Sequence, residues 1–414
     1  MSSAAAQPAQ HPTGHPGPSP SRVLIVAHYY PPHLGGIEMV AREEAVRLAA
    51  RGVEVTVLTS GERSSVREED GVRVVRVTAW NGAERRAGVP FPVLSPMLIP
   101  AALRWVRRAE VVHVHDCLYP TSWAAGLAAA LTRTPLVLTQ HVALVQHPSA
   151  PVRLVQRAVY AVAGRFLLRR SRSVHTLNAS VSAFVLGLGV RAERLRHLPN
   201  GVDTTLFRPA ASAEERVLAR SALDLPQDRP LVLFVGRPVP KKGYDLLLAS
   251  AADGYDLVVA GDAGNNDDGA ATTGGPTVHR LGVLSSAALA TAYRACDVFA
   301  LPSTAEGFPL TVQEAMASGL PVLTTDDPGY APYRLDGTQA VLVPRRADAI
   351  RAALSELVGS ADRRDGLGTA ARRYAEAHFD WERHVTALAG HYAAALHGSA
   401  APAGGCSDEP ERPR

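Results

Sequence analysis

The chain carries one local pattern in its first half and again in its second half: a buried strand, a loop and a helix. In the first half, residues 22–27 read as a strand, 28–36 as a loop rich in Pro and Gly, 37–51 as a helix and 53–59 as the next strand. The pattern restarts with a strand at residues 230–235. Units of this kind build parallel sheets with right-handed crossovers, so the pattern restricts the chain to the α/β class.

The same reading extends through both halves. Further strands are predicted at residues 111–115, 136–139, 173–177, 196–198, 256–260, 277–281, 297–301 and 321–324. Further helices are predicted at residues 243–252, 285–295, 310–318 and 380–396. The predicted architecture is two Rossmann-like domains that face each other across a deep cleft, where ligands bind beyond the carboxyl ends of the strands. The boundaries are a first domain at 21–205, a second domain at 206–378, a helix at 379–398 that crosses back to the first domain, and disordered tails at 1–20 and 399–414.

Composition excludes several classes of protein. Three widely separated cysteines argue against a disulfide framework or a zinc site, and favour a reducing, cytoplasmic compartment. No apolar run approaches the ~20 residues that a membrane-spanning helix needs. Residues 21–200 carry a net charge of +11 and residues 201–414 one of −7, so the two halves are expected to face different partners. The basic half lacks interleaved aromatic residues, and nucleic acid is therefore not expected among them.

The stretch S-T-A-E-G-F-P-L-T-V-Q-E at residues 303–314 carries the strongest functional signal. It leads from a buried strand into a helix, with Pro309 at the first helical position, where a missing N–H costs nothing. A helix start at the carboxyl end of a parallel strand is suited to a phosphate. Glu306 and Glu314 flank this site and could accept hydrogen bonds from sugar hydroxyls. The alternative is that both glutamates are solvated or support the helix dipole.

Two loops at strand ends suit a diphosphate. Gly36 follows Gly35 between the first strand and its helix, where glycines allow close approach of a ligand or merely form a turn. Arg237 and Lys242 lie in the loop G-R-P-V-P-K-K-G after the strand at 230–235. An arginine fork and a lysine point charge together could bind a diphosphate and stabilise a departing one. The alternative for that loop is a solvated surface segment.

Three histidines end strands of the first half. His141 gains weight as a site residue because it ends a strand on the side of the cleft. His113 and His115 are expected to be structural, since metal binding there would need acids that the sequence does not place. A lone histidine is more often structural than catalytic, and that alternative also applies to His141.

In combination these motifs resemble the family-4 retaining glycosyltransferases of the GT-B fold, over residues 22–397. The resemblance rests on the order and spacing of six motifs: G-G-I-E at 35, T-Q-H at 139, L-P-N-G-V-D-T-T-L-F-R-P at 198, G-R-x-x-x-K-K-G at 236, S-T-A-E-G-F-P-L-T-V-Q-E-A-M-A-S-G-L-P-V at 303 and F-D-W-E-R at 379. Two departures are Pro238, where a leucine is common, and the segment 327–333, which replaces a G-G and P-E and leaves the sugar preference open.

The resemblance implies a role for each candidate residue. Gly36, Arg237 and Lys242 would meet the donor diphosphate, and Glu314 the ribose hydroxyls. Backbone N–H groups of the stretch Phe308, Pro309, Leu310 and Thr311, apart from the proline, would bind phosphate and sugar. Glu306 and His141 would lie on either side of the transferred sugar as the catalytic residues. The donor is a nucleoside-diphosphate sugar, UDP- or GDP-linked, and no metal or other cofactor is expected.

The acceptor is expected to carry a hydroxyl and to bind the first domain. Residues 151–172 place Arg153, Arg157, Arg165 and Arg169 among Val152, Val155, Val159, Val162 and Phe166. Such a helix could lie on an anionic membrane surface, which suggests a peripheral enzyme at the inner face of the membrane with a lipid-linked glycan or polysaccharide precursor as acceptor. The alternative is a surface helix that packs its apolar face on the sheet.

Two rival functions remain at the level of sequence. A sugar-nucleotide epimerase of the same fold is disfavoured by the E-G-F-x-x-x-x-x-E spacing and by the G-R…K-K-G loop. A catalytically idle sugar-nucleotide sensor is disfavoured because Glu306, Arg237, Lys242 and Glu314 are all present.

Overall fold

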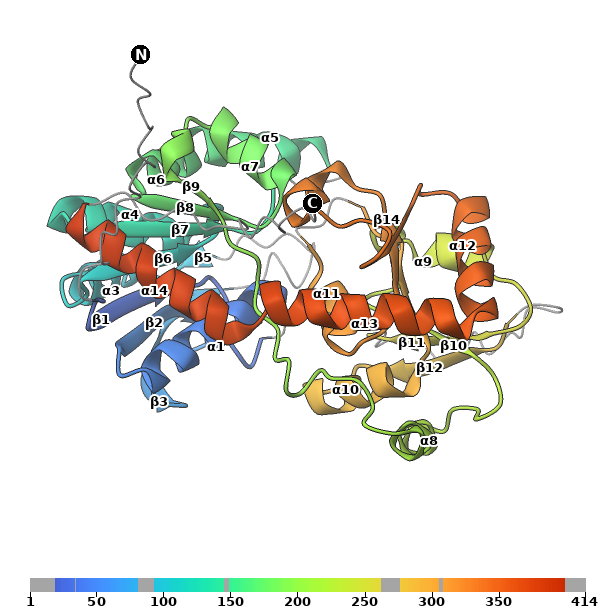
Figure 1. Ribbon diagram of the computed structural model, residues 1–414. Coiled ribbons are helices and arrows are strands. Elements are labelled where there is room, and N and C mark those ends of the chain that lie inside the picture. The colour runs from blue at the N-terminus through green and yellow to red at the C-terminus, as the bar shows by residue number, and fades with distance from the viewer. Residues whose placement is uncertain are drawn as a thin grey trace, which may run out of the picture.

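The computed structural model describes residues 19–33, 35–80, 93–144, 149–261, 276–304 and 308–398. They form two α/β units, each with a mainly parallel sheet between layers of helices (Figure 1). The predicted α/β class with two Rossmann-like units is therefore confirmed. The predicted tails lie outside the described residues, apart from Ser19 and Pro20.

The first sheet has the strand order β3-β4-β2-β1-β6-β7-β8-β9, with β5 beside β4. Its strands are β1 (Arg22–Val26), β2 (Glu54–Gly61), β3 (Ser65–Glu69), β4 (Val72–Trp80), β5 (Val93–Leu94), β6 (Val111–His115), β7 (Leu136–Gln140), β8 (Ser173–Thr176) and β9 (Leu195–His197). All neighbours are parallel except β3 and β5, which pair antiparallel with β4. Because the inner strands are covered on both faces, they are continuous apolar runs rather than alternating ones.

The second sheet has the order β12-β11-β10-β13-β14-β15 and is parallel throughout. Its strands are β10 (Leu231–Val235), β11 (Asp256–Ala260), β12 (Val278–Gly282), β13 (Val298–Leu301), β14 (Val322–Thr325) and β15 (Val341–Val343). Since β10 and β13 are neighbours, the loops that follow them lie side by side at one edge of this sheet.

Helices cover both sheets (Figure 1). In the first unit they are α1 (Gly36–Ala50), α3 (Leu98–Val106), α4 (Pro120–Thr132), α5 (Ala150–Val159), α6 (Arg165–Arg170) and α7 (Ala179–Gly187). In the second part of the chain they are α8 (Ala213–Ala222), α9 (Tyr244–Ala249), α10 (Ser286–Ala295), α11 (Leu310–Ala317), α12 (Ala347–Gly359), α13 (Ala361–His378) and α14 (Trp381–His397). In the described parts of the chain, no helix combines the length and the apolar character that crossing a membrane requires.

The last two helices run end to end from the second unit to the first (Figure 1). On α14, the side chains of Trp381, Leu388 and Tyr392 are buried in the same cluster as Val23 and Ile25 of β1. Thus the C-terminal helix completes the core of the first unit.

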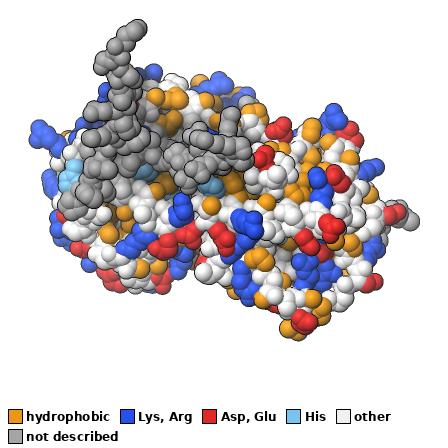
Figure 2. Space-filling view, viewed as in Figure 1, with side chains coloured by type: hydrophobic (Ala, Val, Ile, Leu, Met, Phe, Trp, Pro, Cys, Tyr) orange, Lys and Arg blue, Asp and Glu red, His pale blue; other side chains and the backbone are white. Residues whose placement is uncertain are grey.

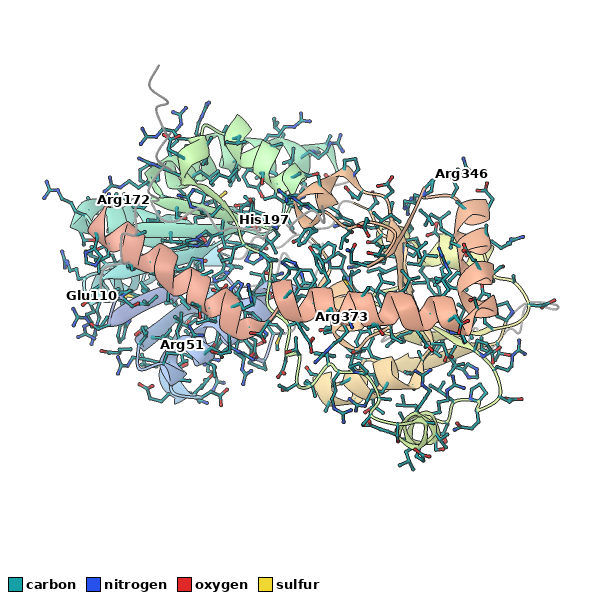
Figure 3. All side chains as sticks on the ribbon, in the orientation of Figure 1. Arg51, Glu110, Arg172, His197, Arg346 and Arg373 are labelled. Carbon is teal, nitrogen blue, oxygen red and sulfur yellow. The ribbon has the colours of Figure 1, made fainter. Side chains whose placement is uncertain are left out.

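Polar contacts hold the start of α14 in place. At the start of α14, the Arg51 guanidinium from the end of α1 donates to the Glu382 carboxylate at 2.6 Å and to its carbonyl oxygen at 2.9 Å (Figure 3). The segment that leads from the first unit to the second passes the start of α14, where Val202 N donates to the Phe379 carbonyl oxygen at 2.6 Å.

Candidate functional site

Two helix starts, one from each unit, face each other at the junction. Gly36 opens α1 after β1, and Leu310 opens α11 after β13. A Cβ placed on Gly36 would lie 3.9 Å from Leu310 Cδ1, and Leu310 packs against the core cluster of the first unit. The first N–H groups of a helix have no partner inside the helix and carry its positive dipole end. The structure therefore brings two anion-seeking helix ends to one place.

The start of α11 is held by an aromatic cluster. Phe308 is buried and stacks on Tyr333 with ring centroids 4.0 Å apart, and it meets Tyr330 edge-on at 5.0 Å. Pro309 has ψ of 133° and is the last extended residue before the helix, not its first helical one as predicted. The Thr311 hydroxyl is buried and has no hydrogen-bond partner among the described residues, so it is available to a ligand.

Glu314 lies in the second turn of α11 and is partly buried. The Tyr293 hydroxyl of α10 lies 2.9 Å from its Oε2 and 3.0 Å from the Thr311 carbonyl oxygen. Burial raises the pKa of the Glu314 carboxyl to about 7, and the hydrogen bond from Tyr293 offsets part of that rise. A group with this pKa changes its charge readily when a ligand hydroxyl approaches.

The basic loop after β10 lies against the same edge. Gly236 has φ of 145°, and the aliphatic part of Lys242 covers it at 3.7 Å from an added Cβ. The short turn Pro240–Lys242 ends at Gly243, whose φ of 74° and close approach to Pro302 O admit only glycine.

This loop is also tied to the stretch that precedes α11. Thr304 N donates to Lys241 O at 3.0 Å. Arg237 is exposed and forms no ion pair with any described residue. Arg237, Lys242, Thr311 and Glu314 thus all follow β10 or β13, whereas Glu306 lies outside the described residues.

His141 directly follows β7 and is nearly buried. Its Nε2 lies 3.0 Å from His115 Nδ1. Burial, with a smaller effect from His115, lowers the pKa of His141 to about 3, so its imidazole is neutral. A neutral ring in this place can donate or accept one hydrogen bond but does not supply a positive charge.

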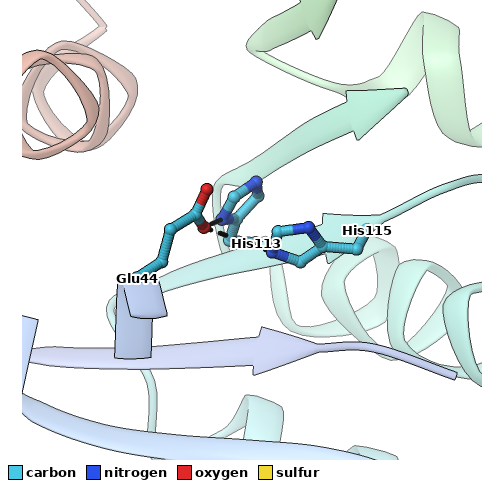
Figure 4. A group of neighbouring side chains, drawn as sticks. All are labelled: Glu44, His113 and His115. Carbon is cyan, nitrogen blue, oxygen red and sulfur yellow. Dashed lines mark ion pairs between the residues drawn. The ribbon is translucent and has the colours of Figure 1, made fainter. Parts of the chain in front are cut away.

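A buried acid lies near His141, beside the two histidines that were expected to be structural. Glu44 of α1 lies next to His113 and His115 of β6 (Figure 4), and it also pairs with His384 of α14. The sequence analysis named neither Glu44 nor His384. Burial raises the pKa of Glu44, but the neighbouring histidines outweigh it and hold that pKa well below its usual range. One signal could have found this acid: Glu44 takes a core position in the buried pattern Val40, Ala41, Ala45 and Leu48 of α1.

The helix predicted at the acceptor side is interrupted. Residues 150–170 form α5, a π-helical turn at Tyr160–Gly164, and α6. Val155, Val162 and Phe166 are exposed, while Leu167 and Leu168 are buried. The alternative in which this stripe packs on the sheet is therefore wrong for those three residues.

Two family models and several known proteins match this chain. The model of the Glycosyltransferase Family 4 matches residues 34–206, and that of Glycosyl transferases group 1 matches residues 216–374. A D-inositol 3-phosphate glycosyltransferase from Gordonia bronchialis is 30% identical, over 93% of this chain and 91% of its own length. The enzyme of the same description from Mycobacterium bovis is 32% identical, over 91% of this chain and 84% of its own length.

Solved structures share the fold. Sucrose-phosphate synthase from Thermosynechococcus elongatus superimposes with a TM-score of 0.71 at 22% identity, over 92% of this chain and 100% of that one. Anabaena HepE in complex with UDP gives a TM-score of 0.70 at 18% identity, over 89% and 98%. Glycosyltransferase models match both halves of the chain, and the relatives that match nearly its whole length are glycosyltransferases. The chain therefore belongs to the group 1, family-4 glycosyltransferases of the GT-B fold.

Proposed function

We propose that this glycosyltransferase moves a hexose-type sugar from a nucleoside-diphosphate donor to a hydroxyl acceptor, with retention of the anomeric configuration and without a metal ion in the chemistry. The observation that carries the donor assignment is the meeting of the α11 start, the Arg237–Lys242 loop and Glu314 at one edge of the second sheet. A UDP donor is favoured over GDP, since HepE, a neighbour in fold, is described in complex with UDP and with UDP-glucose.

Each residue has a defined task in this proposal. The N–H groups at the starts of α1 and α11 bind the diphosphate, together with Arg237 and Lys242. Glu314 accepts hydrogen bonds from the ribose hydroxyls. Glu306 holds the hydroxyls of the transferred sugar, and neutral His141 lies on its other side.

The reaction is a front-face displacement. The bond from the anomeric carbon to the phosphate oxygen breaks while the acceptor oxygen bonds to the same face of that carbon. The departing phosphate oxygen takes the acceptor's proton, so the protein supplies position and charge rather than a nucleophile. A double displacement through a carboxylate is the rival, and it requires a covalent glycosyl-enzyme intermediate.

The donor site is tested by calorimetric titration with UDP-, GDP- and ADP-sugars. We expect one nucleotide to bind the wild-type chain and to bind at least ~10-fold more weakly to Arg237→Ala and Glu314→Ala, since each loses a charged hydrogen bond. Arg346→Ala is the matched control, because Arg346 is an exposed cation of the same unit that pairs only with Asp348 among the described residues. Equal binding by all three variants would place the donor elsewhere.

The acceptor is proposed to be a lipid-linked or membrane-proximal glycan. Arginine and apolar side chains lie together on the surface over α5 and α6, at the upper edge of Figure 2. Leu154, Val155, Val162 and Phe166 are 43–74% exposed there, beside Arg165 and Arg169. Exposed apolar residues with cations suit an anionic membrane surface.

Sedimentation with anionic vesicles tests this surface. We expect binding that weakens with salt and is lost in Val162→Ser combined with Phe166→Ser. No difference between anionic and neutral vesicles would contradict it. The rival acceptor is a phosphorylated polyol, because the relatives at 30–32% identity are named for inositol 3-phosphate.

Turnover assays separate the remaining functions. Release of nucleoside diphosphate that depends on inositol 3-phosphate, and not on lipid extract, would favour the polyol acceptor. An epimerase changes the sugar nucleotide without any acceptor, and an idle sensor binds it without turnover. The configuration of the new glycosidic bond, measured by NMR, distinguishes retention from inversion.

A further inference from the structure

The strongest unassigned feature is the buried group Glu44, His113 and His115 (Figure 4). His113 and His115 are two positions apart on β6, so both side chains project from the same face of the sheet, toward α1 and α14. Glu44 reaches them from α1. All three side chains are at most 1% exposed, and one ligand atom of each lies within 4.8 Å of the others.

The distances in this group match those between the ligands of a tetrahedral metal ion. Glu44 Oε2 lies 3.4 Å from His113 Nδ1 and 3.2 Å from His115 Nε2. Zinc–ligand bonds of about 2.0–2.1 Å at the tetrahedral angle separate neighbouring ligand atoms by roughly 3.3 Å. One ion can therefore reach all three atoms with small side-chain movements.

Two of the three ligand atoms lack a hydrogen bond. Glu44 Oε2 and His115 Nε2 are buried, yet neither has a hydrogen-bond partner among the described residues, although they are only 3.2 Å apart. Leaving buried polar atoms without partners is costly. Both atoms therefore retain the capacity to bind a further group.

The second ring nitrogen of each histidine, the one that does not face Glu44, is also held by a neighbour. His113 Nε2 lies 2.8 Å from Thr139 Oγ1, and His115 Nδ1 lies 3.0 Å from His141 Nε2. Histidines that bind metals have this arrangement, in which the second nitrogen is oriented by a hydrogen bond.

Glu44 is a buried carboxylate whose surroundings contain few strong cations. Its ion-pair partners among the described residues are three histidines, without arginine or lysine. The third histidine, His384, bridges the Pro199 carbonyl oxygen at 2.8 Å and Glu44 Oε1 at 2.9 Å, so Oε2 is the carboxylate oxygen that faces His113 and His115.

We propose that Glu44, His113 and His115 bind a divalent transition-metal ion, with Zn²⁺ the best match to two imidazoles and one carboxylate. The Tyr392 hydroxyl of α14 is hydrogen-bonded to His113 Nδ1 at 2.7 Å, so this hydroxyl would have to move when that nitrogen binds the ion. The ion would link α1 to β6 in the core of the first unit. The ion would not contact the transferred sugar itself, because His115 lies between the ion and His141, to which it is hydrogen-bonded.

The alternative is a proton instead of an ion, with one imidazole protonated against the Glu44 carboxylate. Metal analysis of the full chain, purified without a histidine tag or chelator, decides between them. We expect about one zinc per chain, removal by a strong chelator with a fall in Tm, and recovery of Tm with Zn²⁺ but not with Mg²⁺. Co²⁺ should give the visible absorption of a tetrahedral site.

Matched variants locate the ion. Glu44→Gln and His115→Gln should lose it, whereas Glu38→Gln should retain it, since Glu38 lies on the same helix and pairs only with His33 among the described residues. A wild-type chain that neither contains zinc nor gains Tm with it overturns the proposal, even if the variants fail to fold. Equal zinc in wild type and Glu44→Gln also overturns it and would indicate an adventitious ion, for example on His11 and His15 of the N-terminal segment.

Discussion

At the scale of single residues, the protonation of Glu314 couples stability to pH. Its pKa is raised from 4.5 to about 7 by burial, so the folded state binds its proton more tightly than the unfolded state does. The associated stability is therefore present below pH 4.5 and is lost as the pH rises through 7. Glu314→Gln keeps an acceptor for the Tyr293 hydroxyl but has no charge. We expect the free energy of unfolding of this variant to exceed that of wild type by about 1–3 kcal/mol at pH 8 and to differ little from it at pH 5.

Denaturant unfolding without donor at both pH values measures this effect. Glu356→Gln is the control, because that carboxylate is exposed and pairs with Arg363 at the surface. A stability gain of equal size at pH 5 and pH 8 would mean that the variant acts through packing and not through the charge.

The buried histidine group marks the limit of sequence reasoning at this scale. The motifs around Arg237, Thr311 and Glu314 follow strands that could be recognised as buried apolar runs, so their placement at one sheet edge was predictable. Glu44 lies some 70 residues before His113 and His115, and only the packing of α1 on β6 unites them. The apolar pattern of α1 indicates which glutamate of the E-E pair is turned inward, but it does not show that Glu44 faces His113 and His115.

At the scale of elements, the predicted strands at 111–115 and 256–260 match the structure, and most others differ by one or two residues at an end. Strand β4 was missed because its arginines, Arg73 and Arg76, interrupt the apolar run. These side chains pair with acids at the sheet edge. The π-turn between α5 and α6 was not predictable, because it adds a residue that periodicity does not reveal.

Gly243 provides a prediction for the element that carries Lys242. Its φ of 74° is unfavourable for other residues, and an added Cβ would lie 2.1 Å from Pro302 O. We expect Gly243→Ala to lower the free energy of unfolding by about 2–4 kcal/mol and to weaken donor binding, since the loop must shift away from β13. Thermal unfolding and donor titration measure the two effects.

Gly337→Ala is the matched control for Gly243. A Cβ there meets nothing within 4 Å, and its φ is outside the left-handed region, so its Tm should stay within error of wild type. If Gly243→Ala lost stability but bound donor normally, the loop would not position Lys242 for the diphosphate.

At the scale of the whole molecule, α14 joins the two units through packing as well as through the chain. Its apolar residues belong to the core of the first unit, although they follow the second unit in sequence. Leu388 is fully buried there, and Leu354 of α12 is fully buried in the core of the second unit. These two leucines allow the same substitution to be made in each core.

We expect Leu388→Ala and Leu354→Ala each to cost about 2–5 kcal/mol of the free energy of unfolding, because both leave a cavity. Their effects on local stability should differ. Amide hydrogen exchange in Leu388→Ala should accelerate most in β1, α1 and β6, which contact or neighbour α14, and least in β10 and β11. Leu354→Ala should give the opposite pattern. Uniform acceleration in both variants would show that the two units unfold as one, and α14 would then transmit stability between them instead of serving the first unit alone.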